Sequence, residues 1–77
     1  MFKTIKGKKR YNVTLFTRYG VFDQEHLAHT ISEAVNHYLA LVLSEYQDKP
    51  DARIETAYGF GRASILHPNG RILIDPA

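Results

Sequence analysis

Residues 30–46, TISEAVNHYLALVLSEY, decide the fold because they carry the clearest helical pattern in the chain. Thr30 and Glu33 have the spacing of a capping box, in which the threonine hydroxyl accepts a bond from the third helical amide and the glutamate returns to the cap amide. Pro50 cannot continue a helix, so segment 48–51 is predicted to end it. Seven apolar side chains recur at helical spacing and define the face that packs on the core: Ile31, Ala34, Val35, Tyr38, Leu39, Val42 and Tyr46.

The residues before this helix have strand patterns. Residues 11–19 alternate with a period of two and are rich in β-formers, which predicts a strand closed by a turn at 18–20. Residues 21–28 are predicted to return as a polar strand near a sheet edge. A second interpretation starts a longer helix at Asp23, because Gln24, Leu27 and Ala28 lie on the same apolar stripe.

The last third of the chain predicts three strands separated by turns. Alternation at 53–58, 63–67 and 71–75 indicates the strands, and glycines at 59 and 61 mark the first turn. Pro68-Asn-Gly70 is a hairpin signal because asparagine and glycine accept a positive φ. We therefore predict an α+β fold over 1–77: a single two-layer domain with one helix packed on an antiparallel sheet, in the order ββαβββ. Residues 1–9 are predicted to form a basic arm, flexible or with a short strand around Phe2–Ile5.

Length and composition exclude several classes of protein. Seventy-seven residues leave room for one domain, and 44% hydrophobic with 23% charged residues is typical of a folded domain. The absence of cysteine excludes disulfides, thiol catalysis and thiolate zinc sites. The longest apolar run, Tyr38–Leu43, is far shorter than the ~20 residues of a membrane span. We expect a cytoplasmic protein with no membrane partner, because the basic N-terminus lacks the apolar stretch of a signal peptide.

Charge is distributed unevenly along the chain. Residues 1–20 carry six basic and no acidic side chains, whereas residues 21–51 carry six acidic side chains against Lys49. Lys8, Lys9 and Arg10 cluster directly before the first predicted strand. Such an uneven distribution of charge is compatible with a surface that attracts a charged partner or with one that is only solvated.

The sequence shows no catalytic constellation, so we expect a protein that is not an enzyme and uses no cofactor. The serines lack the context of an activated nucleophile, and the glutamates fall on exposed positions. His26 and His29 are three residues apart, as metal ligands often are, but a site needs a third ligand. If 21–28 is a strand, the two side chains need not converge; on the longer helix they would share a face with Glu33.

The segment Tyr58-Gly-Phe-Gly-Arg-Ala-Ser-Ile65 resembles the glycine–aromatic strand of RNA-recognition domains, in which ring faces stack on bases. It departs from that pattern because Arg62 replaces the second aromatic residue and the chain has one helix rather than two. An exposed Phe60 beside Arg62 is also a plausible protein contact, since aromatic residues and arginine dominate binding hot spots. Phe16 and Arg18 form a second such pair on the outer face of the first strand.

The whole chain resembles the small phage-encoded anti-CRISPR proteins in its size and its order of hairpin, helix and antiparallel strands. The residues that carry the resemblance are the helix start Thr30–Ala34, the segment Arg53–Thr56, and Asn69–Arg71 followed by a last strand at Ile72–Asp75. That group has no shared catalytic motif. The resemblance implies inhibition by occupation, in which basic and aromatic side chains cover the surface where crRNA-guided DNA would bind.

We therefore expect a non-enzymatic phage or mobile-element accessory protein that binds and inhibits a larger host complex, such as a CRISPR surveillance complex. The alternatives are a nucleic-acid-binding module that uses the same basic arm and exposed aromatics, and a homodimer formed through the flank of the helix at Leu41 and Leu43. The side chains predicted to contact the partner are Lys8, Lys9, Arg10, Arg18, Phe60 and Arg62.

Overall fold

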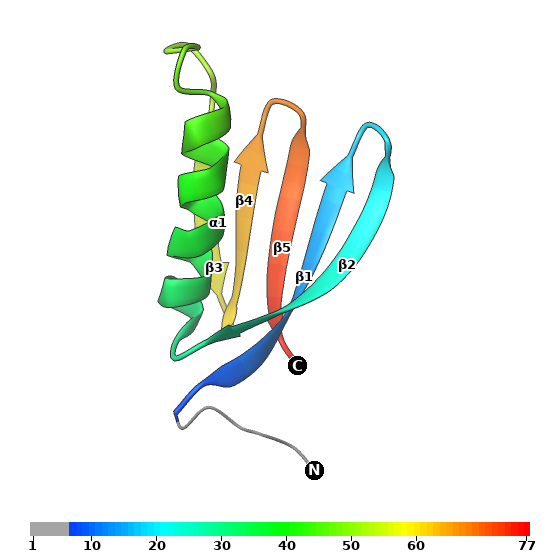
Figure 1. Cartoon of the computed structure of the whole chain (residues 1–77), viewed down its shortest axis with the longest axis vertical. Helices are drawn as coiled ribbons and strands as arrows, with labels where there is room; N and C mark the ends of the chain where they lie inside the picture. Colours follow the sequence, from blue (N-terminus) through cyan, green and yellow to red (C-terminus); the bar gives the residue numbers. More distant parts are fainter. Residues whose placement is uncertain (1–6) are drawn as a thin grey trace.

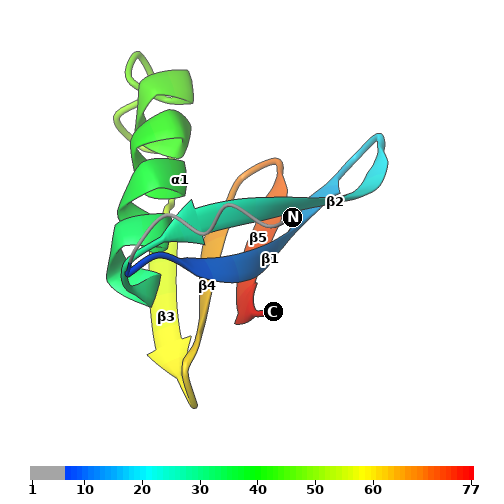
Figure 2. The same ribbon diagram turned by 60° about the horizontal axis from the view of Figure 1, so that its bottom comes forward.

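Five antiparallel strands lie side by side in the order β2-β1-β5-β4-β3, and one helix covers one face of the sheet (Figures 1 and 2). The structure is a computed structural model that describes residues 7–77. The predicted α+β fold and its order ββαβββ are confirmed. Residues 1–6 of the predicted arm 1–9, with the possible strand around Phe2–Ile5, lie outside the described residues, and Lys9 at the end of the arm is the first residue of β1. The elements are β1 (Lys9–Thr17), β2 (Gly20–Ala28), α1 (Ile31–Glu45), β3 (Glu55–Gly59), β4 (Arg62–His67) and β5 (Gly70–Pro76).

The segment that the sequence left open between strand and helix is a strand. β2 pairs with β1 over its whole length, from Gly20 opposite Thr17 to Ala28 opposite Lys9. The alternative helix beginning at Asp23 is therefore wrong. The ladder with β1 pairs one side of the backbone of this segment, and the chain turns away only at residues 29 and 30.

The core lies between α1 and the inner face of the sheet. The helical stripe predicted from the sequence faces it, with Val35 at 1% and Tyr38 at 4% exposure. Alternate residues of β1, β4 and β5 complete the core, and Val13, Ile65 and Ile74 are completely buried. No buried side-chain polar atom in residues 7–77 lacks a hydrogen-bond partner, as expected for a well-packed interior.

The helix begins as predicted and ends earlier. Thr30 is extended (φ −138°), and its Oγ1 accepts a bond from the Glu33 amide at 3.1 Å. The Glu33 carboxylate bonds the His29 ring instead of returning to the cap amide. The last helical residue is Glu45, ahead of the predicted end at 48–51. Tyr46 caps the helix, and its hydroxyl accepts a bond from the Asn69 amide at 3.2 Å, which ties the helix end to the β4–β5 turn.

Each of the three hairpins within residues 7–77 turns through two residues. The turns are Arg18–Tyr19, Phe60–Gly61 and Pro68–Asn69. In the last turn the positive φ falls on Gly70 (153°), while Asn69, contrary to expectation, has none. A Cβ on Gly70 would lie 1.8 Å from the Phe16 carbonyl oxygen. Only glycine lets β5 start this close to β1.

No helix within residues 7–77 is long and apolar enough to cross a membrane. The face of the sheet opposite α1 has no covering layer in the described chain (Figure 2). An antiparallel sheet tolerates such an arrangement because its strands alternate apolar and polar side chains. In β1, Val13 points to the core, whereas Asn12 and Thr14 point to this open face.

Gly70→Ala is expected to lower the free energy of unfolding by about 3 kcal/mol, because the added Cβ collides with backbone and the φ is strained. Gly59→Ala is the matched control: a Cβ there meets nothing within 4 Å, so stability should stay constant or rise by about 0.5 kcal/mol. Urea unfolding followed by circular dichroism measures both. Equal effects of the two variants would contradict the close β1–β5 approach.

Candidate interaction site at the β3–β4 end of the sheet

The β3–β4 hairpin presents an aromatic ring to solvent from a strained backbone. Phe60 (φ 53°) and Gly61 (φ 74°) both have positive φ, as a type I′ turn requires. Asparagine, aspartate and glycine usually occupy such positions, and a bulky side chain there is an outlier. The side chain of Phe60 is fully exposed, at 105% of its reference area. Phe60 therefore has a backbone conformation that costs free energy, and its ring buries no apolar area within the described chain.

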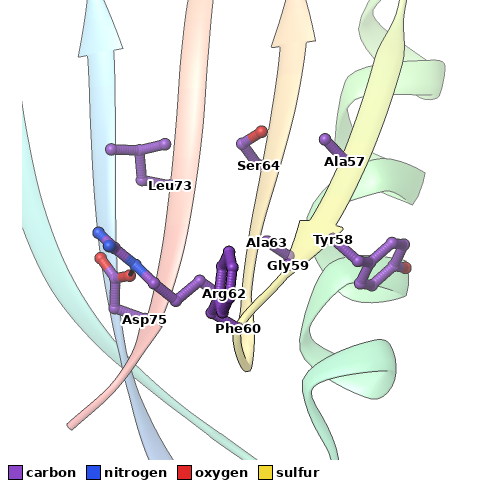
Figure 3. Close-up of a pocket in the computed structure, with 9 residues that line it drawn as sticks. All are labelled: Ala57, Tyr58, Gly59, Phe60, Arg62, Ala63, Ser64, Leu73 and Asp75. Atoms are coloured by element: carbon purple, nitrogen blue, oxygen red, sulfur yellow. Dashed lines mark hydrogen bonds and ion pairs between the residues drawn. The ribbon is translucent and has the colours of Figure 1, made fainter.

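Arg62 follows the turn and lies on the open face of the sheet. Its Nε donates to Asp75 on β5, one position beyond the Ala63–Ile74 pair at which the β4–β5 ladder ends. Figure 3 shows the arginine reaching toward Asp75, while Tyr58 points to the other side of the sheet, toward α1. The ion pair holds the guanidinium beside the turn, and Arg62 remains 65% exposed.

These side chains border a cleft of about 340 Å³ on the open face. Phe60 stands at its rim, and Ser64 and Leu73 lie farther up the sheet (Figure 3). The sequence did not single out Asp75, Ser64 and Leu73. The hairpin signal at Pro68-Asn-Gly70 indicates that β4 and β5 pair, but it does not say which face of the sheet stays uncovered. The residues that line the cleft are Ala57, Tyr58, Gly59, Phe60, Arg62, Ala63, Ser64, Leu73 and Asp75.

The basic cluster lies at the same end of the molecule. Lys8 precedes β1, and Lys9 and Arg10 are its first residues. Lys9 and Arg10 line a second cleft, of about 480 Å³, together with Gly61 of the β3–β4 turn. The structure thus brings five of the six predicted contact residues to one end: Lys8, Lys9, Arg10, Phe60 and Arg62.

Arg18 does not belong to this group. It lies in the β1–β2 turn, at the opposite end of the sheet from the β3–β4 turn (Figure 1). Its guanidinium donates to Asn69 Oδ1 at 2.6 Å, which links the β1–β2 and β4–β5 turns. Phe16, its predicted partner, lies on the open face and is 37% exposed. Arg18 therefore links two hairpins at the end of the sheet away from the other five predicted contact residues.

The open face carries charges of both signs. By strand alternation, Arg10, Arg62 and Arg71 point to it. Four carboxylates share the face: Asp23, Glu25, Glu55 and Asp75. This face is therefore not the uniformly positive surface that typical nucleic-acid-binding sheets present.

The histidines separate into different contacts. The ring of His26 stacks on that of His37 with centroids 4.5 Å apart, and the Tyr38 ring meets both edge-on. His29 instead bonds Glu33 at 3.0 Å, which lowers the pKa of that carboxyl. His26 and His29 do not converge, and in the described part of the chain no three His, Asp or Glu side chains are grouped to hold a metal ion.

The arrangement at the β3–β4 end offers an exposed ring, an anchored guanidinium and nearby basic side chains. These groups suit binding to another molecule: the ring supplies apolar contact area, and the cations supply directional hydrogen bonds.

Comparisons with protein-family models, with curated proteins and with solved structures found no match to the chain.

The pKa of His26 is expected below its ordinary value because burial penalises the charged ring and the neighbouring His37 repels it. The unfolded chain then binds more protons than the folded chain between the folded pKa and about 6.5. The free energy of unfolding is therefore highest above about pH 6.5, where the His26 ring is neutral in both states. It decreases as the pH falls towards the pKa of His26 in the folded chain. His26→Gln should flatten this pH dependence, measured by urea unfolding at a series of pH values.

The His37→Phe variant separates the two causes, because it keeps a stacked ring and removes the charge. An NMR titration of the His26 ring protons should then show a pKa that rises but stays below the ordinary value, since burial is the larger cause. A pKa of His26 that is unchanged in His37→Phe would contradict the coupling between the rings.

Proposed function

We propose that this protein is a non-catalytic binding protein that occupies a surface of a larger partner. Its contact site consists of Lys8, Lys9, Arg10, Phe60 and Arg62. The observation that carries the proposal is Phe60, which is fully exposed at a strained positive φ beside an anchored arginine. Residues in sparsely populated conformations cluster at functional sites, where the strain has a use.

The energetics favour a partner with an apolar pocket. A positive φ costs a non-glycine residue about 1–2 kcal/mol, and a ring that stays in water returns nothing. Burial of a phenylalanine side chain contributes about 1.5–3 kcal/mol. A partner that accepts the ring would therefore recover the cost, with Arg62 and the basic cluster at the rim of the interface. Aromatic residues and arginine are typical of such hot spots.

The partner we propose is a nucleic-acid-handling protein complex of the host, as the resemblance to phage anti-CRISPR proteins implies. Inhibition would follow from occupation alone, because a protein seated where guided DNA binds excludes that DNA. In this proposal the protein acts in the cytoplasm of the host cell and performs no chemistry. A protein partner is favoured over free nucleic acid because four carboxylates share the open face and Arg62 is engaged by Asp75.

Phe60→Asn is expected to stabilise the fold and to weaken binding, since asparagine tolerates positive φ but supplies no ring. The free energy of unfolding should rise by about 0.5–1 kcal/mol, or about 2–8 °C in Tm. Affinity for a purified, crRNA-loaded type I surveillance complex, measured by biolayer interferometry, should fall at least about tenfold.

Tyr19→Asn provides the matched control. Tyr19 is an 84% exposed aromatic in the β1–β2 turn at the other end of the sheet, and its φ is negative. This variant should leave both stability and affinity near their starting values. If Tyr19→Asn weakens binding as much as Phe60→Asn does, the contact site is placed at the wrong end.

Free nucleic acid is expected to bind weakly. Fluorescence anisotropy with labelled single-stranded DNA, duplex DNA and RNA, at low and at moderate salt, tests this directly. Tight binding that weakens steeply with salt would overturn the proposal in favour of a nucleic-acid-binding module, because each neutralised phosphate releases counterions. The triple variant Lys8→Ala, Lys9→Ala, Arg10→Ala should then abolish it.

A homodimer is the remaining alternative. Leu41 and Leu43 flank the core stripe of α1 and are 56% and 51% exposed. A self-association through this flank would appear as a dimer in sedimentation velocity. It would leave the contact site of the β3–β4 end free, so the two surfaces can be tested separately.

A further inference from the structure

β2 is an edge strand with an exposed backbone. It pairs with β1 on one side, and no described strand lies on its other side. Its register with β1 runs over nine residue pairs without a bulge, and residues 20–28 contain no proline, lysine or arginine. These are the devices with which proteins usually protect a sheet edge from a further strand. The charged side chains of the β2 edge are two acidic ones, Asp23 and Glu25.

The register identifies which backbone groups are available. The Ala77 amide donates to the Arg10 carbonyl, so the backbone of Arg10 faces β5. By the alternation of an antiparallel ladder, the odd-numbered residues of β1 face β2, and their partners in β2 are even-numbered. The odd-numbered residues of β2 therefore direct their N–H and C=O groups away from the sheet. These residues are Val21, Asp23, Glu25 and Leu27.

The same four residues define a side-chain pattern on the open face. Val21 and Leu27 are 59% and 41% exposed, and between them lie the two carboxylates of Asp23 and Glu25. Neither carboxylate makes a hydrogen bond or an ion pair within residues 7–77. Both border a cleft of about 530 Å³ that Asp75 also lines. Along the edge the order is apolar, acidic, acidic, apolar.

We propose that the β2 edge binds an extended basic segment of another polypeptide, which adds to the sheet as a sixth strand. The unpaired backbone groups supply a ladder for the main chain, as in other cases of strand addition. Residues opposite one another in adjacent strands point to the same face. The bound segment therefore carries lysine or arginine at two alternate positions, opposite Asp23 and Glu25, with an apolar residue at the next alternate position on either side.

Charge excludes a second copy of β2 as the occupant. If two copies of β2 paired antiparallel about Gln24, Asp23 of each copy would lie opposite Glu25 of the other. In the neighbouring registers of this pair, acidic side chains would also lie opposite or diagonal to one another. Like charges in directly opposed positions destabilise a sheet. The other edge, β3, offers only five residues and one acidic side chain, Glu55. The long acidic edge therefore selects a basic strand.

The test uses the full chain and the synthetic peptide acetyl-Val-Thr-Lys-Thr-Lys-Thr-Val-amide, whose alternate positions match the edge in an antiparallel ladder, in which the two lysine amides face β2. Hydrogen exchange followed by NMR should show that the amides of Val21, Asp23, Glu25 and Leu27 exchange freely without peptide. At saturating peptide they should become at least about tenfold protected. A peptide N-methylated at both lysine amides has the same charge and cannot form the ladder, so it should not protect them.

Two charge variants complete the experiment. Glu25→Lys should weaken peptide binding by about tenfold, because it replaces an attraction with a repulsion. Glu55→Lys makes the same charge change on the β3 edge and should leave binding unchanged; thermal unfolding confirms that both variants fold. The proposal is overturned if the N-methylated peptide protects the amides equally, if both variants weaken binding equally, or if the peptide protects other amides. Protection that depends on protein concentration alone would instead assign the edge to a second copy.

Discussion

The pairing of β1 with β5 is the constraint on which the rest of the structure depends. It joins the first described strand to the last, and it places β5 between β1 and β4 at the centre of the sheet. The pairing begins where the chain leaves Gly70, so close to the Phe16 carbonyl that a side chain would not fit. Contacts of such long sequence separation cost loop-closure entropy. The buried apolar face shared with α1 offsets that cost.

The same pairing assembles both proposed surfaces. It brings the basic start of β1 to the end of the sheet where the β3–β4 turn projects. The contact between Arg62 and Asp75 depends instead on the pairing of β4 with β5. It also places β2 at the outside of the sheet, because both sides of β1 and β5 are taken. Within residues 7–77 one helix covers one face, and no described element covers the other face or pairs with the outer edge of β2.

Local signals were sufficient for the helix, the turns and the strands other than β2. The Thr30 cap, the helical stripe and the three turns were predicted from spacing and residue type, because each depends on neighbours within a few residues. The choice between strand and helix for residues 21–28 was not settled in the same way. The pattern of apolar residues in this segment is compatible with a strand or a helix. The segment is a strand because it pairs with β1 along its full length.

The amino-acid sequence by itself determined the fold class, the order of the elements and the presence of an exposed aromatic–arginine pair at Phe60 and Arg62. The tertiary structure decided the order of strands in the sheet, the separation of Arg18 from the other predicted contacts, and the stacking of His26 on His37. The physical reason is range. Caps, turns and periodicity act between near neighbours, whereas strand order and cross-strand contacts are fixed by burial among residues that are distant in the chain.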